Sequence, residues 1–200
     1  MLIKTIPVGQ LETNCYIVTN EKTLECVVID PGDESNTILE YLEDNKLRCR
    51  AIMLTHGHFD HTGAVESVME ETGATVYMNT RDDVRTQKQM PFGFALPEGG
   101  IDYDDGDIID EAGLRFEIIA TPGHTPGHMC LFDREKSLMF TGDHILFDIS
   151  PNITFWPSVK DSLTDYIVSL DKVRSLNVAT ALPGHRNCGK ITANERIDQL

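Results

Sequence analysis

Short apolar runs separated by turn residues fill the first half of the chain, and amphipathic segments lie between some of them. The first three runs predict an antiparallel β-meander, which the Asp-Pro-Gly turn at 30–32 ends sharply. The expected strands of this half are residues 2–8, 14–19, 25–29, 51–54 and 74–78. Helical spacing predicts helices over 35–45 and 62–72, the second stopped by Gly73, and residues 80–90 are also compatible with a helix.

The second half repeats this order without repeating the sequence. Strands are expected at 107–109, 114–120, 129–132, 137–140 and 178–182, and helices at 162–175 and 192–200. The last helix would place Ile191, Ile197 and Leu200 on one apolar face. Strands followed by a helix in each half predict two sheets packed face to face with helices outside them. A chain of 200 residues is long enough for one domain over 1–200.

Composition narrows the class of protein. An apolar content of 40% with 24% charged residues is typical of a globular protein, and no apolar run reaches the roughly 18 residues of a membrane span. The first residues lack the long apolar segment of a secretory signal. The five cysteines are scattered, without a Cys-x-x-Cys pair, which favours free thiols in a reducing compartment. A cytoplasmic location without a membrane partner is therefore expected.

The charge of the chain bears on its partners. A formal net charge of −15 repels phosphate backbones, and the sequence has no run of Lys and Arg that would offset it. We therefore expect no nucleic-acid partner. The sequence leaves the oligomeric state open.

The densest group of chemically active residues follows the apolar run at 51–54. His56, His58, Asp60 and His61 place three imidazoles and a carboxylate within six positions. Residues two apart at the end of a strand point the same way, so His56 and His58 can share a target. Imidazole and carboxylate together are ligands for zinc, iron or manganese. Histidines in a polar loop by chance are the ordinary alternative, but this spacing after a strand favours a metal site.

Three further candidates also follow expected strands. His124, Asp143 and His185 come after the strands at 114–120, 137–140 and 178–182, and a glycine immediately precedes each of them. Glycine permits tight backbone geometry and close approach. A single Gly-His pair is usually only a turn. Their common position at strand ends indicates that they converge with the first group.

Together these motifs resemble the metallo-β-lactamase-fold hydrolases over nearly the whole chain. The matching motifs are Asp30-Pro31-Gly32, residues 56–61, His124, Asp143 and His185. The resemblance implies an α/β fold, a four-layer αββα sandwich with metals at one edge. Similar members usually continue into a C-terminal helical segment, so this chain is expected to be a single domain without that extension.

The resemblance also implies a ligand set. His56, His58 and His124 would hold one metal, and Asp60, His61 and His185 a second. Asp143 would bridge both ions, and Asp30 would hydrogen-bond a ligand histidine. Two divalent ions are expected, zinc first, with iron and manganese as alternatives. Asp60 and Asp143 would be the catalytic carboxylates, because they leave the site with a net positive charge that favours hydroxide at neutral pH.

Aspartate at position 143 and the segment Thr13-Asn14-Cys15-Tyr16 resemble the glyoxalase II-like branch of this family. The resemblance implies a dinuclear metal-dependent hydrolase in which hydroxide attacks the carbonyl of a small thioester, lactone or similar acyl substrate. One alternative is a mononuclear iron dioxygenase of the persulfide type. Another is a nuclease of the same fold, against which the acidic surface argues.

Two loops rich in apolar side chains are predicted to line a substrate pocket. The pocket candidates are Phe92, Phe94, Phe147, Phe155 and Trp156. The alternative is that these loops cap the sandwich and bury their own side chains. His128 and His144 lie outside the ligand pattern, and the sequence leaves open whether they are structural or contact the site.

Overall fold

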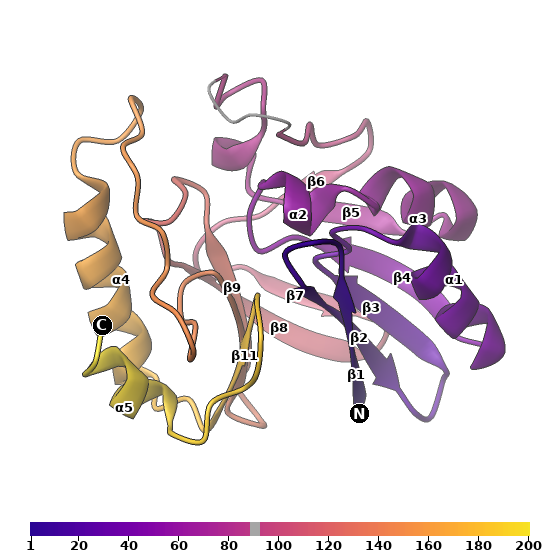
Figure 1. Cartoon of the computed structure of the whole chain (residues 1–200). Coiled ribbons are helices and arrows are strands. Elements are labelled where there is room, and N and C mark those ends of the chain that lie inside the picture. Colours follow the sequence, from indigo (N-terminus) through magenta and orange to yellow (C-terminus); the bar gives the residue numbers. More distant parts are fainter. Residues whose placement is uncertain (89–92) are drawn as a thin grey trace.

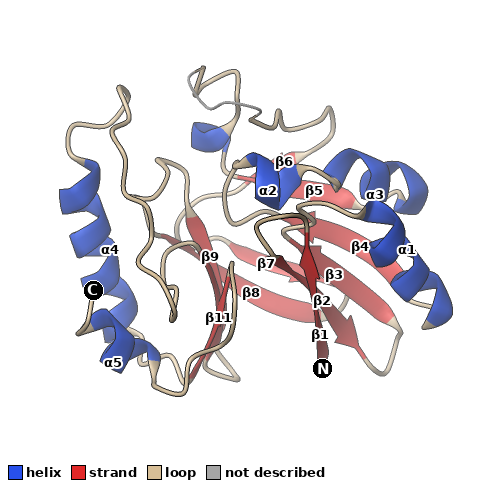
Figure 2. Ribbon diagram, viewed as in Figure 1, coloured by secondary structure: helices blue, strands red, loops and turns tan. Residues whose placement is uncertain are grey.

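Two β-sheets pack face to face, and helices cover their outer faces (Figures 1 and 2). The computed structural model describes residues 1–88 and 93–200. From one side to the other, the layers are α1 with α3, a six-stranded sheet, a five-stranded sheet, and α4 with α5. This arrangement confirms the predicted α/β fold with an αββα order.

The six-stranded sheet begins as the predicted antiparallel meander and continues as parallel strands. Its strands, in order across the sheet, are β1 (Leu2–Val8), β2 (Thr13–Asn20), β3 (Glu25–Ile29), β4 (Arg48–Met53), β5 (Thr75–Met78) and β6 (Ile101–Asp102). Because β3, β4 and β5 are parallel, their carboxyl ends meet at one edge of the sandwich.

The five-stranded sheet is antiparallel except for its last pair, β10 and β11, which is parallel. Its strands are β7 (Ile108–Glu111), β8 (Leu114–Ala120), β9 (Met129–Asp133), β10 (Leu138–Gly142) and β11 (Thr180–Pro183). The helices are α1 (Ser35–Asp44), α2 (Phe59–Thr62), α3 (Val65–Thr72), a short 3₁₀ helix η1 (Thr80–Asp82), α4 (Ser162–Ser175) and α5 (Ala193–Ile197). No helix within residues 1–88 and 93–200 is long and apolar enough to cross a membrane.

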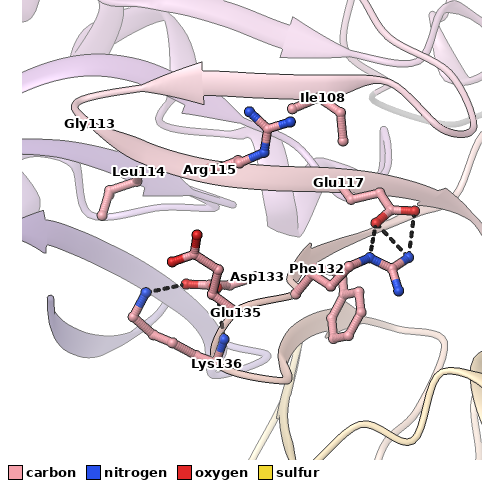
Figure 3. A pocket seen from close by; sticks show the side chains of 10 residues that line it. Ile108, Gly113, Leu114, Arg115, Glu117, Phe132, Asp133, Glu135 and Lys136 are labelled. Atoms are coloured by element: carbon pink, nitrogen blue, oxygen red, sulfur yellow. Dashed lines mark hydrogen bonds and ion pairs between the residues drawn. The ribbon is translucent and has the colours of Figure 1, made fainter.

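A pocket of about 530 Å³ lies over β7, β8 and β9, near the turn that joins β7 to β8 (Figure 3). Most of its charged side chains pair within the protein, because Arg134 pairs with Glu117 at 2.6 Å and Lys136 pairs with Asp133 at 2.7 Å. The basic and acidic side chains of the pocket are equal in number. The pocket lies at the start of β8, whereas His124 follows the other end of that strand.

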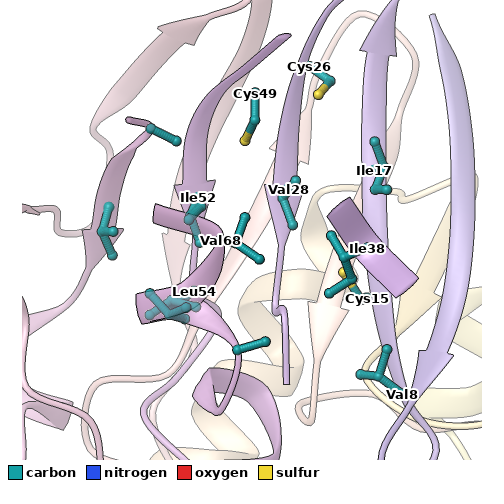
Figure 4. Packing of buried hydrophobic residues seen from close by; sticks show 14 of the residues in the cluster. Val8, Cys15, Ile17, Cys26, Val28, Ile38, Cys49, Ile52, Leu54 and Val68 are labelled. Carbon is teal, nitrogen blue, oxygen red and sulfur yellow. The ribbon is translucent and has the colours of Figure 1, made fainter. Parts of the chain in front are cut away.

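Alternating side chains of the central strands build two of the apolar layers. On β3, Cys26 and Val28 face the helices, and Val27 and Ile29 face the second sheet. Beneath the helices, Ile38 of α1 and Val68 of α3 pack in the same cluster as Val28 (Figure 4). Strands buried on both faces are continuously apolar, which is why 25–29 and 51–54 could be recognised in the sequence.

Three predicted helices differ from the structure. The helix expected over 62–72 is broken into α2 and α3, because Gly63 packs on the backbone of Gly32 and the Ala64 N–H donates to the Pro31 carbonyl at 2.9 Å. Of the helix allowed over 80–90, only the 3₁₀ turn η1 forms among the described residues. The side chain of Asp83 accepts the Arg85 N–H at 2.8 Å, which competes with helical hydrogen bonding.

The C-terminal helix is shorter than the predicted 192–200. A capping box at Thr192 starts α5, which ends at Ile197. Ile197 is buried beside α4, but Ile191 and Leu200 are 36% and 37% exposed, so the predicted three-residue apolar face is wrong. Instead, Arg196 holds α5 to the body by donating to the Leu146 carbonyl at 2.6 Å.

Candidate metal centre

The candidate ligands come from four strand ends at one edge of the sandwich. The segment 56–61 follows β4, His124 follows β8, Asp143 follows β10 and His185 follows β11. Thr13 at the start of β2 forms an isolated bridge with His185, which ties the two sheets together beside the site. All seven predicted ligands are brought together here.

Three histidines form the first group. His58 Nδ1 lies 3.0 Å from His56 Nε2 and 3.0 Å from His124 Nε2. The other ring nitrogen of His124 faces the Asn152 carbonyl at 2.7 Å, so it carries the proton and donates. His124 Nε2 is then a bare lone pair, aimed at the other two rings.

The second group contains Asp60, His61 and His185. His61 Nε2 lies 3.3 Å from His185 Nε2, and Asp60 Oδ2 lies 3.3 Å from His185 Nε2. His185 Nδ1 faces the Leu11 carbonyl at 3.1 Å, and His61 Nδ1 faces a carboxylate oxygen of Asp30 at 2.9 Å. These acceptors hold a proton on Nδ1 of each ring, so Nε2 is the nitrogen that each ring would offer to a metal ion.

Asp143 lies between the two groups. Its Oδ2 is 3.4 Å from His124 Nε2 and 3.4 Å from His185 Nε2, and its Oδ1 is 3.6 Å from His61 Nε2. Oδ1 is buried and has no hydrogen-bond partner among the residues that the structure describes. A buried carboxylate oxygen without a donor requires a compensating partner.

The donor set fits divalent metal ions. Nitrogen ligands about 2.0–2.1 Å from a tetrahedral zinc ion would lie about 3.3–3.4 Å from one another. The separations of 3.0–3.6 Å in the two groups fall around that value. Ligand atoms of His56, His58 and His124, and likewise of Asp60, His61 and His185, all lie within 4.8 Å of one another.

Asp30 organises both groups from one buried position. Its carboxylate accepts the Thr55 N–H at 2.7 Å, the Thr55 hydroxyl at 2.7 Å and His61 Nδ1–H at 2.9 Å. Because the Thr55 hydroxyl donates to Asp30, its oxygen is left to accept from His56 Nδ1–H at 3.1 Å. Asp30 therefore fixes the tautomer of His61 directly and that of His56 through Thr55, as hydrogen-bonded carboxylates do around metal ligands.

Electrostatics differ between the two groups. Burial, with the neighbouring His124, lowers the pKa of His58 to about 4, so the ring is neutral at pH 7. Burial alone raises the pKa of Asp60, but the hydrogen bond from His185 and the charges of His61 and His185 together outweigh it and bring the pKa to about 2. For His185, burial is outweighed by Asp143 and Asp60, which raise the pKa to about 10. Without metal, Asp60 and His185 thus form an ion pair, whereas His58 is a neutral base.

The two remaining histidines have different surroundings. His128 Nε2 accepts the backbone N–H of Asp143 at 3.1 Å, and its Nδ1–H donates to the Thr121 hydroxyl at 2.8 Å. His128 therefore supports the Asp143 backbone. His144 is buried and packs edge-on against the ring of Tyr166, with centroids 5.3 Å apart.

The predicted pocket residues have different positions. Trp156 is buried, donates its indole N–H to the His124 carbonyl at 3.0 Å and lies 6.2 Å from the ring of His58. Phe94 belongs to the core under α3 and also lines a cavity of about 410 Å³ beside α2. Phe147 packs near α4, and Phe155 is 78% exposed. Phe92 lies outside the described residues. Only Trp156, among the described pocket candidates, has a recorded contact with the candidate ligands.

Several supporting groups could not be identified from the sequence. The carbonyls of Leu11 and Asn152 fix two histidine tautomers, and a backbone carbonyl carries no signal in the residue type. The Thr13 hydroxyl donates to Asp60 at 3.2 Å, and the buried carboxylate of Asp82 contacts the loops around His56 and His124. Thr13 lies in the segment 13–16, which resembles the glyoxalase II-like branch of the family. Asp82 lies in the segment 80–90, for which the sequence indicated only a possible helix.

The chain folds as an αββα sandwich, and imidazole and carboxylate side chains converge at one edge of it. This arrangement is that of a metal-binding protein with a four-layer fold. The sequence model described as the metallo-beta-lactamase superfamily matches residues 8–185. The chain belongs to that superfamily, whose members are generally metal-dependent hydrolases, and membership implies divalent metal binding.

Individual proteins of known sequence or structure are also similar to this chain. The hydroxyacylglutathione hydrolase GloC of Haemophilus influenzae is 32% identical over 157 residues, covering 74% of this chain and 73% of that protein. The di-iron-bound form of TTHA1623 is 30% identical with a TM-score of 0.76, covering 95% of this chain and 94% of the other. BLEG-1, a B3 metallo-beta-lactamase, is 25% identical with a TM-score of 0.81, covering 98% and 97%.

Proposed function

We propose that the protein is a dinuclear metal-dependent hydrolase acting on a small thioester or lactone. The observation that carries this proposal is Asp143, whose carboxylate lies within 3.6 Å of ligand nitrogens from both groups. The likeness to a di-iron-bound structure supports two ions, and the likeness to GloC supports a thioester substrate.

Two divalent ions at this site would supply Lewis acidity and lower the pKa of a bound water. The chain contributes the ionised carboxylates of Asp60 and Asp143, whose pKa values are held low by the histidines around them despite burial. It also provides an acceptor for the outer ring nitrogen of His56, His61, His124 and His185, which leaves the other nitrogen of each ring facing inward. Neither carboxylate needs to act as a nucleophile in this arrangement.

A thiol nucleophile is not needed either. Burial raises the pKa of Cys130 to about 12 and that of Cys15 well above its usual range, so both remain thiols at neutral pH. Cys188 is exposed but its pKa is also raised by burial of the sulfur. Hydrolysis at the metal centre is therefore the chemistry that the residues favour.

The second group is the more open side of the site. The side chains of Asp60 and His185 are 13% and 11% exposed, whereas in the first group His56 is fully buried and His124 is 5% exposed. We propose that an acyl substrate approaches over Asp60 and His185. A net charge of −15 disfavours a polyanionic substrate such as RNA at this surface.

The test is an activity screen on protein reconstituted with zinc, iron or manganese, using thioesters, lactones and a phosphodiester. Asp143→Asn is the matched inactive control, because it keeps the side-chain shape. Hydrolysis of an acyl substrate that is lost in the variant supports the proposal. Oxygen uptake with a persulfide by protein holding one iron would replace it with the dioxygenase. Cleavage of bare RNA as the main activity would replace it with a nuclease.

A further inference from the structure

Asp82 is a fully buried carboxylate that the proposed chemistry does not use. It is the last residue of η1, and Asn79 caps this turn by accepting the Arg81 N–H at 3.0 Å. Its Oδ1 accepts the Gly127 N–H at 2.6 Å. Its Oδ2 accepts the Gly57 N–H at 3.2 Å and the hydroxyl of Thr125.

These three donors belong to the two loops that carry the first group. Gly57 separates His56 from His58, and Thr125 directly follows His124. A single carboxylate thus joins segments from β4 and β8 that are otherwise far apart in the sequence.

Both glycines pack directly against Asp82. A Cβ on Gly57 would lie 2.5 Å from the Asp82 carbonyl oxygen, and one on Gly127 would lie 2.8 Å from the Asp82 nitrogen. Real Cβ atoms do not approach backbone atoms this closely, so neither position has room for a side chain. The two loops therefore pack closely against Asp82 and also donate hydrogen bonds to it.

The charge of Asp82 has no cation beside it. The neighbouring Arg81 pairs with Asp104 at 2.5 Å, and Arg85 pairs with Asp83. Within residues 1–88 and 93–200, no ion pair involves Asp82. The carboxylate of Asp82 is therefore held only by neutral donors from the two ligand loops.

We infer that Asp82 is a positioning residue for the three-histidine group: it fixes the loops of His56, His58 and His124 in the arrangement that a metal ion between them would need. The inference rests on the proposed metal centre. It distinguishes the two buried aspartates, because Asp30 bonds His61 directly and reaches His56 only through Thr55, whereas Asp82 bonds the loops of the first group.

Asp82→Asn is the direct test, and Asp83→Asn is its matched control. Asp83 is adjacent and 2% exposed, and it accepts the Leu96 N–H at 2.9 Å without a recorded hydrogen bond to the ligand loops. The measurement is a zinc competition titration against a chromophoric chelator. In Asp82→Asn, one of the two ions should bind roughly 10–100-fold more weakly, and the other should stay within about threefold. Asp83→Asn should match the parent protein.

A His185→Ala background identifies which ion is affected, since it leaves only the three-histidine group complete. Adding Asp82→Asn there should weaken the remaining ion by the same factor. Thr125→Val serves as a milder variant that keeps the carboxylate, with an expected weakening of roughly threefold to tenfold for one lost hydrogen bond. Urea unfolding of the metal-free variants separates a general loss of stability from a loss of metal affinity.

Equal zinc affinities in Asp82→Asn, Thr125→Val and Asp83→Asn would overturn the inference while leaving the dinuclear proposal intact. Weakening of both ions to the same extent would also overturn it, because Asp82 would then act on the whole fold. A parent protein that binds fewer than two ions at saturation would overturn the dinuclear proposal itself, and the inference with it.

Discussion

Replacing Asp30 by asparagine should selectively weaken the metal ion of the second group. Asp30 is 2% exposed and satisfies three donors at 2.7, 2.7 and 2.9 Å. Asparagine keeps the shape but offers one oxygen and one NH₂ group. If its oxygen stays near His61 Nδ1, the NH₂ group faces the Thr55 N–H, and a buried donor is left without an acceptor.

The magnitude follows from these contacts. The unsatisfied buried N–H costs about 1–3 kcal/mol of folding stability, and the bond to His61 loses its charge assistance. A less basic His61 donates its lone pair less strongly, so we expect the second ion to bind roughly 10–100-fold more weakly, about 1.4–2.8 kcal/mol. The first group should change less, because Asp30 reaches His56 only through Thr55.

The assay is the zinc competition titration, with urea unfolding of metal-free protein alongside it. Asp33→Asn is the control, since Asp33 lies three residues away and is exposed. Unchanged affinity for both ions in Asp30→Asn would refute the reasoning that Asp30 sets the tautomer of His61. A loss confined to the three-histidine group would refute the assignment of Asp30 to the second half.

Three further predictions concern the centre and the core. Asp143→Asn should abolish hydrolysis and lower the affinity for both ions, whereas His144→Gln should keep two ions per chain; equal metal loss by mass spectrometry would be contrary evidence. In the metal-free protein, Asp143 and Asp60 outweigh burial and raise the pKa of His185 to about 10. The charged His185 ring therefore stabilises the folded metal-free protein fully below pH 6.5, and this stabilisation is lost as the pH rises through 10. Metal uptake at pH 7.5 should therefore release about one proton, seen as a dependence of calorimetric heats on the buffer, and identical heats in all buffers would argue against it. Phe116→Ala should lower the free energy of unfolding by about 3–5 kcal/mol in urea titrations, because Phe116 is fully buried between the sheets; a loss under about 1 kcal/mol would mean that the site collapses around the cavity.

The four layers of the fold could be predicted from the sequence because the pattern of apolar residues indicates which positions are buried. Strands 2–8 and 25–29 and the helix 162–175 were predicted with the bounds that the structure has. The errors fall where tertiary contacts override local pattern. Gly63 breaks a helix because the backbone of Gly32 lies against it, and the two-residue strand β6 is too short to leave a pattern.

The convergence of the candidate ligands could be predicted, because strand ends of a sandwich meet at an edge and histidine and aspartate are visible in the sequence. The groups that orient those ligands were harder to find. Asp30 was expected from a motif, but Asp82 acts through contacts with Gly57 and Gly127 that lie 25 and 45 positions away. Phe155, which was predicted to line a substrate pocket, is 78% exposed, and its role there stays a prediction.

The number of metal ions per chain tests the central claim most directly. Native mass spectrometry of the protein, reconstituted with zinc and handled without chelator, should show two ions per chain. Asp143→Asn should show a mixture with fewer, since both groups share that carboxylate. A parent protein that saturates at one ion, or an Asp143→Asn variant that keeps two with unchanged affinity, would contradict the account.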